Sequence, residues 1–117
     1  MDNNKQQKFT KLSIRTLKSL EVISLSEIYY LEAEKQYTIF HLEGGKQFVA
    51  SKNIGFYQEK LPEELFFRVH QSYLVNMLKV YSYHLKTKIV ILTNKERVRV
   101  SRRNHSAFKS FLDEFNA

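Results

Sequence analysis

Short runs in which apolar and polar residues alternate recur along most of this chain, and this pattern constrains the fold most strongly. In the first run, Leu12 and Ile14 alternate with Lys11, Ser13 and Arg15. Further runs, rich in β-branched and aromatic residues, cover residues 20–25, 28–33, 37–42, 47–50, 80–83, 88–92 and 97–100. Alternation with period two is typical of half-buried strands, and these residue types favour sheets. The sequence therefore predicts a mainly β fold.

Two segments change to the helical period. Residues 51–61 carry apolar residues at helical spacing after the capping candidates Ser51 and Asn53, and Pro62 ends the segment. The closing segment begins at Ser101 and places a single apolar stripe along a helix, formed by Phe108, Phe111, Leu112 and Phe115. We therefore expect two short helices beside the sheets.

The stretch after the only proline has the most informative pattern. Residues 67–70 alternate apolar side chains with Arg and His, which predicts a strand. Gln71 and Ser72 then form a polar corner, and we expect the apolar run 73–75 to be a turn anchored by Asn76. Binding residues concentrate on loops that a rigid scaffold carries. The side chains of this corner are therefore candidates for function.

Positive charge is concentrated in the C-terminal half of the chain. Ten Lys or Arg residues and one acid, Glu96, lie between positions 68 and 109, so this window carries +9 while the whole chain carries +7. The basic residues are Arg68, Lys79, Lys86, Lys88, Lys95, Arg97, Arg99, Arg102, Arg103 and Lys109. A basic window of this kind is the electrostatic footprint of a protein that binds a polyanion.

Length and composition limit the remaining classes of protein. The 117 residues suit one domain, which we place at residues 9–117 behind a tail or linker remnant at residues 1–8. The sequence has no cysteine, no apolar run of the roughly 20 residues that a membrane span needs, and no hydrophobic signal core. We therefore expect a cytoplasmic protein that does not enter a membrane.

The titratable residues do not follow the patterns of catalytic or metal sites. No two of the four histidines have the i, i+4 spacing of a helical metal site. Glu32 and Glu34 share one face of a strand, where a solvated pair is commoner than a catalytic pair. The chain also lacks a glycine-rich phosphate loop. The sequence therefore predicts no enzyme activity, no cofactor and no metal.

The start of the last helix has side chains suited to nucleic acids. Arg102, Arg103 and Asn104 combine guanidinium groups with the free backbone N–H groups of a helix start, which suit phosphate or guanine. The two arginines oppose the helix macrodipole, which costs a few tenths of a kcal/mol. Because the cost is so small, chance can account for this placement of the arginines. The alternative is that the arginines bind a partner outside the fold.

The polar corner allows two interpretations for each of its residues. Gln71 and Asn76 carry the paired donor and acceptor that read adenine. Gln71 equally fits an ordinary exposed side chain, and Asn76 fits a buried amide that satisfies its own backbone. His70 fits either a core histidine or a contact.

Three motifs lie in order along residues 10–115. They are Ile28–Ala33 followed by a polar corner and Tyr37, the run Phe67–Asn76, and Val98–Arg103 at the start of the final helix. Together they resemble the signature of the LytTR family of DNA-binding domains (the LytR/AlgR type). The resemblance implies packed antiparallel sheets in an elongated, LytTR-like β-sandwich. It also implies the output domain of a bacterial two-component response regulator or a stand-alone transcription regulator.

The resemblance also implies a mode of action. It implies binding of double-stranded DNA at direct-repeat promoter sites, with loops instead of a recognition helix in successive major grooves. By position, the candidate base contacts are Lys35, Gln36, Gln71 and Arg103. The candidate phosphate or secondary contacts are Tyr37, His70, Ser72, Asn76, Lys79, Arg102, Asn104 and Lys109. A homodimer on DNA fits this mode, and a sensor kinase would act only through a receiver domain, which this sequence does not contain.

One departure and two alternatives accompany this prediction. Gln71 stands where the family often has Arg or Lys, so the target sequence is not predicted. The first alternative is an RNA-binding or general polyanion-binding β module, which shares the basic window but would prefer single strands. The second is a protein-interaction module that uses exposed sheet edges or an acidic partner.

Overall fold

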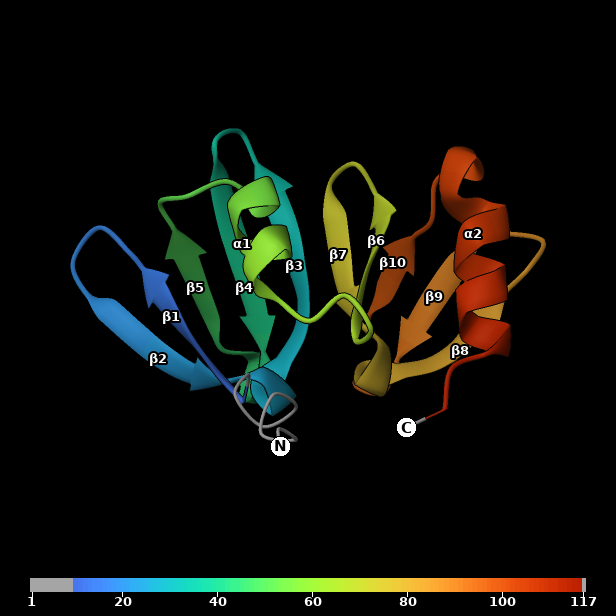
Figure 1. Cartoon of the computed structure of the whole chain (residues 1–117), viewed down its shortest axis with the longest axis horizontal. Coiled ribbons are helices and arrows are strands. Elements are labelled where there is room, and N and C mark those ends of the chain that lie inside the picture. Colours follow the sequence, from blue (N-terminus) through green and yellow to red (C-terminus); the bar gives the residue numbers. More distant parts are fainter. Residues whose placement is uncertain (1–9, 117) are drawn as a thin grey trace, which may run out of the picture.

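The computed structural model describes residues 10–116, and the tail predicted at residues 1–8 lies outside them. The strands are β1 (Lys11–Arg15), β2 (Leu20–Ser24), β3 (Ile28–Glu34), β4 (Tyr37–Leu42), β5 (Gln47–Ala50), β6 (Phe66–His70), β7 (Tyr73–Asn76), β8 (Val80–His84), β9 (Ile89–Leu92) and β10 (Arg97–Arg99). The helices are α1 (Ile54–Lys60) and α2 (Arg102–Asp113), and the short 3-10 turns are η2 (Leu25–Glu27), η3 (Glu43–Gly45) and η4 (Met77–Lys79). The predicted mainly β fold with two short helices is confirmed (Figure 1).

The strands of the described region form three antiparallel sheets. The central sheet has five strands in the order β5-β4-β3-β7-β6. The β1–β2 hairpin lies beside β5 at one end of this sheet, and α1 lies over β4 and β3 (Figure 1). The three-stranded sheet β10-β9-β8 lies with α2 at the other end (Figure 1). The packed antiparallel sheets that the LytTR resemblance implied are therefore present.

The central sheet contributes to two hydrophobic cores. Leu31 and Leu74 belong to the core that includes the β1–β2 hairpin and Tyr57 of α1. Val75 belongs to a second core with β9, β10 and Phe108 of α2. Neighbouring residues such as Leu74 and Val75 fill different cores because successive side chains of a strand point to opposite faces. Burial on both faces makes the central sheet a rigid support for the turns at its ends.

Residues 73–76 correct one prediction, because they form strand β7 and not an anchored turn. This strand pairs with β3 on one side and with β6 on the other. An interior strand that is buried on both faces has a continuous apolar run, so its residues lose the alternation that marks half-buried strands. Gln71 and Ser72 are left as a two-residue turn between the paired residues His70 and Tyr73.

Both helices begin at residues that the sequence identified. The side chain of Asn53 accepts a hydrogen bond from the Phe56 N–H at 2.9 Å and caps α1. Ser101 caps α2 in the same way, with its hydroxyl accepting from the Asn104 N–H at 3.2 Å. Each such cap contributes about 1 kcal/mol. Helix α1 ends just before Pro62, as predicted.

Candidate nucleic-acid interface

Three segments that are far apart in the sequence meet along one edge of the molecule. These are the β3–β4 turn, the β6–β7 turn and the start of α2 (Figure 1). The Ala33 N–H donates to the Ser72 carbonyl at 2.8 Å and ties the two turns together. The Ser101 N–H donates to the Val69 carbonyl at 2.9 Å and ties the start of α2 to β6. We call this surface the loop edge, defined by Lys35, Gln36, Gln71, Ser72, Arg102, Arg103 and Asn104.

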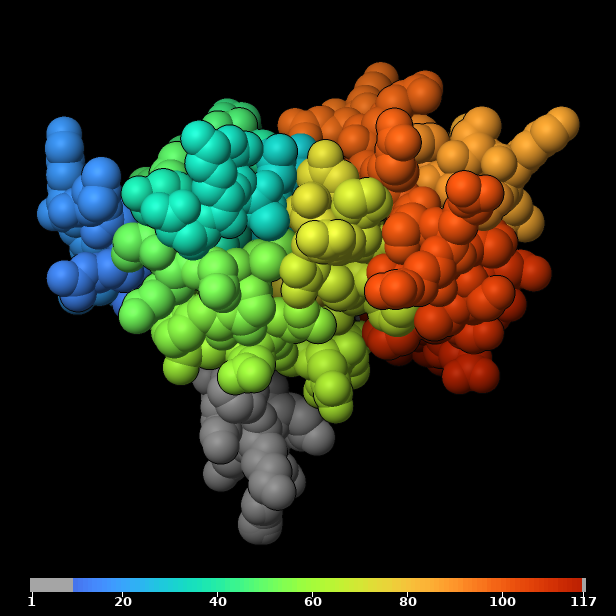
Figure 2. Space-filling view, turned by 90° about the horizontal axis from the view of Figure 1, so that it is seen from above, coloured from blue at the N-terminus to red at the C-terminus, as the bar shows by residue number. Residues whose placement is uncertain are grey.

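Figure 2 views the loop edge from above, with the cyan β3–β4 turn, the yellow β6–β7 turn and the orange-red start of α2 on the same face. The side chains of Lys35, Gln36, Gln71, Arg102 and Arg103 are exposed there. All four predicted base contacts therefore lie on one accessible surface. Figure 2 shows a broad surface at this edge, not a deep cleft.

The β3–β4 turn holds Lys35 in an unusual backbone conformation. Glu34 pairs with Tyr37, so Lys35 and Gln36 are the only residues of the turn. Lys35 has φ 56°, in the left-handed region that favours glycine. A lysine at this position carries about 1 kcal/mol of strain relative to glycine. Tyr37 is half-buried behind the turn.

Arg68 holds the β6–β7 turn in place. Its Nε and Nη2 atoms both donate to the Gln71 carbonyl, at 3.2 and 2.6 Å, and Nε also donates to the His70 carbonyl at 3.2 Å. Its Nη1 atom donates to the side chain of Gln58 in α1 at 2.6 Å. Burial lowers the pKa of the Arg68 guanidinium, but arginine stays charged at neutral pH. The guanidinium of Arg68 is therefore used in hydrogen bonds within the protein, and it orients the turn that exposes Gln71.

A second contact fixes the orientation of His70. The Ser72 N–H donates to the Nδ1 atom of His70 at 3.0 Å. In the neutral ring the proton is therefore on Nε2, which is left as a donor. The ring lies 5.3 Å from the ring of Tyr73 and is half-buried. His70 is thus a half-buried histidine that is bonded to the turn.

The start of α2 presents two free arginines beside a fixed asparagine. Arg102 and Arg103 are exposed, and no described residue lies within ion-pair distance of either guanidinium. The Nδ2 atom of Asn104 donates to the Arg68 carbonyl at 3.2 Å, so Asn104 helps join α2 to β6. Lys109 is exposed on the same helix. It lies about 10 Å from Arg102 along the axis of α2, at 1.5 Å per residue.

Asn76 lies inside the protein and not on the loop edge. It is 1% exposed, and its Nδ2 atom donates to the carbonyls of Leu25 and Ile28 at 3.3 and 2.8 Å. Its Oδ1 atom accepts from the Leu78 N–H at 3.0 Å. The side chain is therefore fully used in connecting η2, β3 and η4.

Lys79 also lies away from the loop edge. Its Nζ atom pairs with the Glu43 carboxylate at 2.7 Å and lies 4.9 Å from the centre of the Tyr29 ring. Glu43 follows β4, which starts at the β3–β4 turn, so the ion pair lies at the opposite end of that strand. Six strand residues separate the two ends by about 20 Å.

The structure adds basic residues that the candidate contacts did not include. Lys52, in the connection from β5 to α1, is held by a hydrogen bond of 2.8 Å from the Thr38 hydroxyl to its carbonyl. The Lys88 carbonyl accepts from the Val100 N–H at 2.9 Å, which brings the β8–β9 turn and exposed Lys86 beside the start of α2. Lys86 and Lys88 were counted in the basic window, but only the fold shows their position.

Residues 10–116 contain no group of three or more His, Cys, Asp or Glu side chains arranged to hold a metal ion. No helix in this region is both long and apolar enough to cross a membrane.

A mainly β fold that carries exposed cationic and amide side chains on three joined loops has the features of a nucleic-acid-binding module. The chain belongs to the LytTr DNA-binding domain family, whose family model matches residues 18–113. A similar solved structure is the LytTr DNA-binding domain of a Bacillus cereus protein described as a methyl-accepting/DNA response regulator. It has 24% sequence identity and a TM-score of 0.77, and the match covers 88% of this chain and 96% of the other. No curated protein sequence matches this chain.

Proposed function

We propose that this protein reads double-stranded DNA in a sequence-specific manner and regulates transcription in a bacterial cytoplasm. The observation that carries this proposal is the joining of three predicted recognition segments into one exposed edge by main-chain hydrogen bonds. Loops held on a buried sheet can enter a major groove with little loss of conformational entropy. Membership of the LytTr DNA-binding domain family supports DNA as the polyanion.

The loop edge divides into base-reading and phosphate-binding side chains. Lys35, Gln36, Gln71 and Arg103 are exposed at the tips of the three segments, and we assign them to base edges in successive major grooves. Arginine suits guanine and glutamine suits adenine. Arg102, Ser72, Asn104 and Lys109, with Tyr37 and His70 as secondary contacts, are assigned to the DNA backbone, which sets position and affinity. Asn76 and Lys79 are left out because one is buried and the other is paired at the far end.

Two copies bound to a direct repeat are part of this proposal. A single loop edge carries few base-reading side chains. Two copies bound side by side would multiply the preference of one copy for its own DNA sequence. The protein would act as the output domain of a response regulator or as a stand-alone regulator.

Arg103→Ala tests the assignment of the start of α2. We expect the variant to bind the duplex selected by the parent protein about 1–3 kcal/mol more weakly, the value of one good bidentate pair, or roughly 5- to 150-fold. Fluorescence anisotropy at about 150 mM salt would measure the affinity, since nonspecific attraction is reduced there. Lys46→Ala is the matched control, because Lys46 is an exposed cation next to η3, away from the loop edge.

The two kinds of contact give different responses. Arg102→Ala should weaken all duplexes alike and reduce the salt dependence by about one phosphate, whereas Arg103→Ala should relax the preference at one base pair. Parental affinity in Arg103→Ala would show that the start of α2 does not read bases. A strong preference of the parent for single strands would favour an RNA-binding or general polyanion-binding module.

A further inference from the structure

Strand β1 has a backbone edge that no strand of residues 10–116 covers, and this edge faces a groove. The Thr16 N–H donates to the Ser19 carbonyl, and the Thr10 carbonyl accepts from the Leu25 N–H. In this register the even-numbered residues of β1 direct their N–H and C=O groups toward β2 and form the hydrogen bonds of the hairpin. Backbone groups alternate in direction along an antiparallel strand. Ser13 and Arg15 therefore direct their N–H and C=O groups away from β2.

Only part of this second edge is used inside the protein. The Arg15 carbonyl accepts from the Ser51 N–H at 2.9 Å, and the Arg15 N–H donates to the Tyr57 hydroxyl of α1 at 3.4 Å. No described residue forms a hydrogen bond with the N–H or C=O of Ser13. An unpaired strand edge is a template for another strand.

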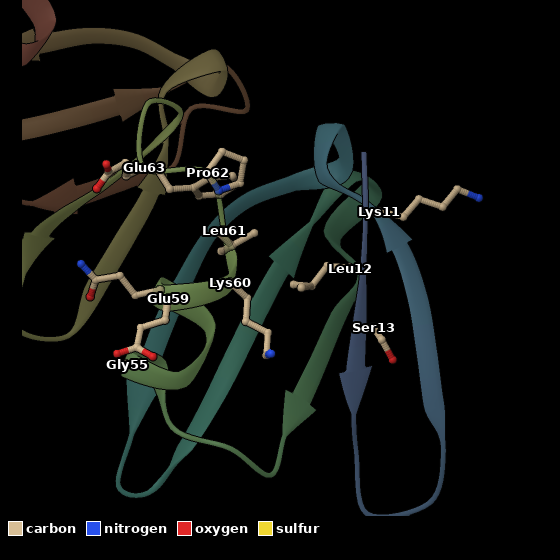
Figure 3. Close-up of a pocket in the computed structure, with 11 residues that line it drawn as sticks. Lys11, Leu12, Ser13, Gly55, Glu59, Lys60, Leu61, Pro62 and Glu63 are labelled. Atoms are coloured by element: carbon tan, nitrogen blue, oxygen red, sulfur yellow. The ribbon is translucent and has the colours of Figure 1, made fainter. Parts of the chain in front are cut away.

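The groove beside this edge is large enough for an extended peptide. It has a volume of about 1050 Å³ and lies between β1 and the segment from α1 to Glu63. Figure 3 shows the side chain of Leu12 pointing across the groove toward α1 and Leu61, whereas the side chains of Lys11 and Ser13 point away. The N–H and C=O groups of Ser13 lie on the same edge as those of Arg15, which reach Tyr57 of α1 and Ser51, so residue 13 offers the groove its main chain. Leu12, which is 8% exposed, supplies an apolar floor.

The groove is lined by two lysines and two glutamates, and the charged side chains that face its gap and the adjoining hollow favour an acidic occupant. Its carboxylates, Glu59 and Glu63, point away from β1 in Figure 3, whereas Lys60 points toward the gap. Beyond Lys60 the groove continues into a smaller hollow of about 300 Å³ whose charged side chains are all cations, those of Arg15, Lys52 and Lys60.

An exposed aromatic ring lies among these cations. The ammonium groups of Lys52 and Lys60 lie 5.3 and 4.9 Å from the centre of the Phe56 ring. The ring is 38% exposed, so it can contact an apolar side chain of a bound peptide while the lysines bind its carboxylates. This combination distinguishes the hollow from an ordinary solvated basic surface.

We propose that this groove binds an acidic, extended peptide segment of a partner protein, which adds as a strand to β1. Main-chain hydrogen bonds to Ser13 would hold the peptide, apolar side chains would pack on Leu12, and carboxylates would meet Arg15, Lys52 and Lys60. Strand addition is a recurring mode of peptide recognition in which backbone pairing supplies affinity and alternate side chains supply specificity. No residue of this site belongs to the loop edge, although Lys52 lies near that edge, and the proposal does not depend on the DNA-reading proposal.

The test uses the full chain and a defined probe. The probe is an acetylated and amidated heptapeptide of alternating Glu and Val, and the control peptide alternates Lys and Val. With the protein labelled with ¹⁵N, we expect the acidic peptide to shift the amide signals of residues 11–15 and 54–62. The basic peptide should shift neither segment. Lys60→Glu should weaken binding at least about tenfold, a 1.4 kcal/mol change, and Lys46→Glu should not.

Methylated peptides separate strand pairing from simple charge attraction without altering the protein. Methylation of alternate peptide nitrogens blocks hydrogen bonding along one edge of the added strand only. We therefore expect one of the two alternate methylation patterns to abolish binding and the other to preserve it. Equal binding by both methylated peptides, shifts confined to Lys35, Gln71 and Arg103, or no shifts at about 1 mM peptide would each overturn the proposal.

Discussion

Asn76→Ala tests whether the buried asparagine is structural. The substitution removes three hydrogen bonds and leaves the carbonyls of Leu25 and Ile28 without their partner. Both of these residues are buried, whereas Leu78 is 47% exposed, so water can replace the bond to its N–H. A buried polar group left unsatisfied costs about 1–3 kcal/mol. The 3.3 Å bond to Leu25 is the weaker of the two, so the free energy of unfolding should fall by roughly 2–4 kcal/mol.

Urea unfolding followed by circular dichroism would measure this loss, and thermal unfolding should show a decrease of about 8–20 °C in Tm. Asn53→Ala is the control, because it removes one exposed capping bond and should cost only about 1 kcal/mol. At a temperature where the Asn76→Ala protein is folded, its affinity for DNA should equal that of the parent. A loss of stability below about 1 kcal/mol, or a loss of affinity in the folded variant, would refute this account of Asn76.

Three further predictions concern Lys35 on the loop edge, Arg68 behind it, and Lys79 at the opposite end of the central sheet. Arg68→Lys keeps the charge but loses the planar fork that holds the Gln71 carbonyl. It should destabilise the protein by about 1–3 kcal/mol and weaken DNA binding in anisotropy titrations, although Arg68 is not among the proposed DNA contacts. Lys35→Gly should relieve the left-handed strain and raise Tm, yet weaken binding, and a loss of both would show that the side chain supports the fold. Lys79→Met removes a pair with Glu43 that contributes up to about 1 kcal/mol. It should leave the affinity for DNA and its salt dependence unchanged, and a reduced salt slope would place Lys79 at the DNA.

The alternating runs predicted most of the fold because they report burial directly. Strands such as β4, with buried and half-buried residues in strict alternation, could be read from the sequence alone. Strand β7 could not, because three of its four residues are buried, so an interior strand resembles any short apolar run. The caps at Asn53 and Ser101 were predicted because capping depends on local spacing.

The candidate site was predicted less completely because it depends on contacts between distant segments. The sequence left Asn76 with two interpretations, and only its bonds to Leu25 and Ile28, about 50 residues away, support the buried one. The pairing of Lys79 with Glu43 spans 36 residues and has no local signal. The fold also decides which basic residues lie near the loop edge, as Lys52 illustrates, because its position follows from a bond to Thr38.

Selection from random duplex DNA at about 150 mM salt, where nonspecific phosphate attraction is weak, tests the central claim most directly. A protein that reads bases with the loop edge should enrich a defined motif, with two copies about one helical turn apart. Arg103→Ala should then lose the preference at one position of that motif. A pool that shows no enrichment, with binding that disappears as salt rises, would contradict sequence-specific reading and leave only a basic surface.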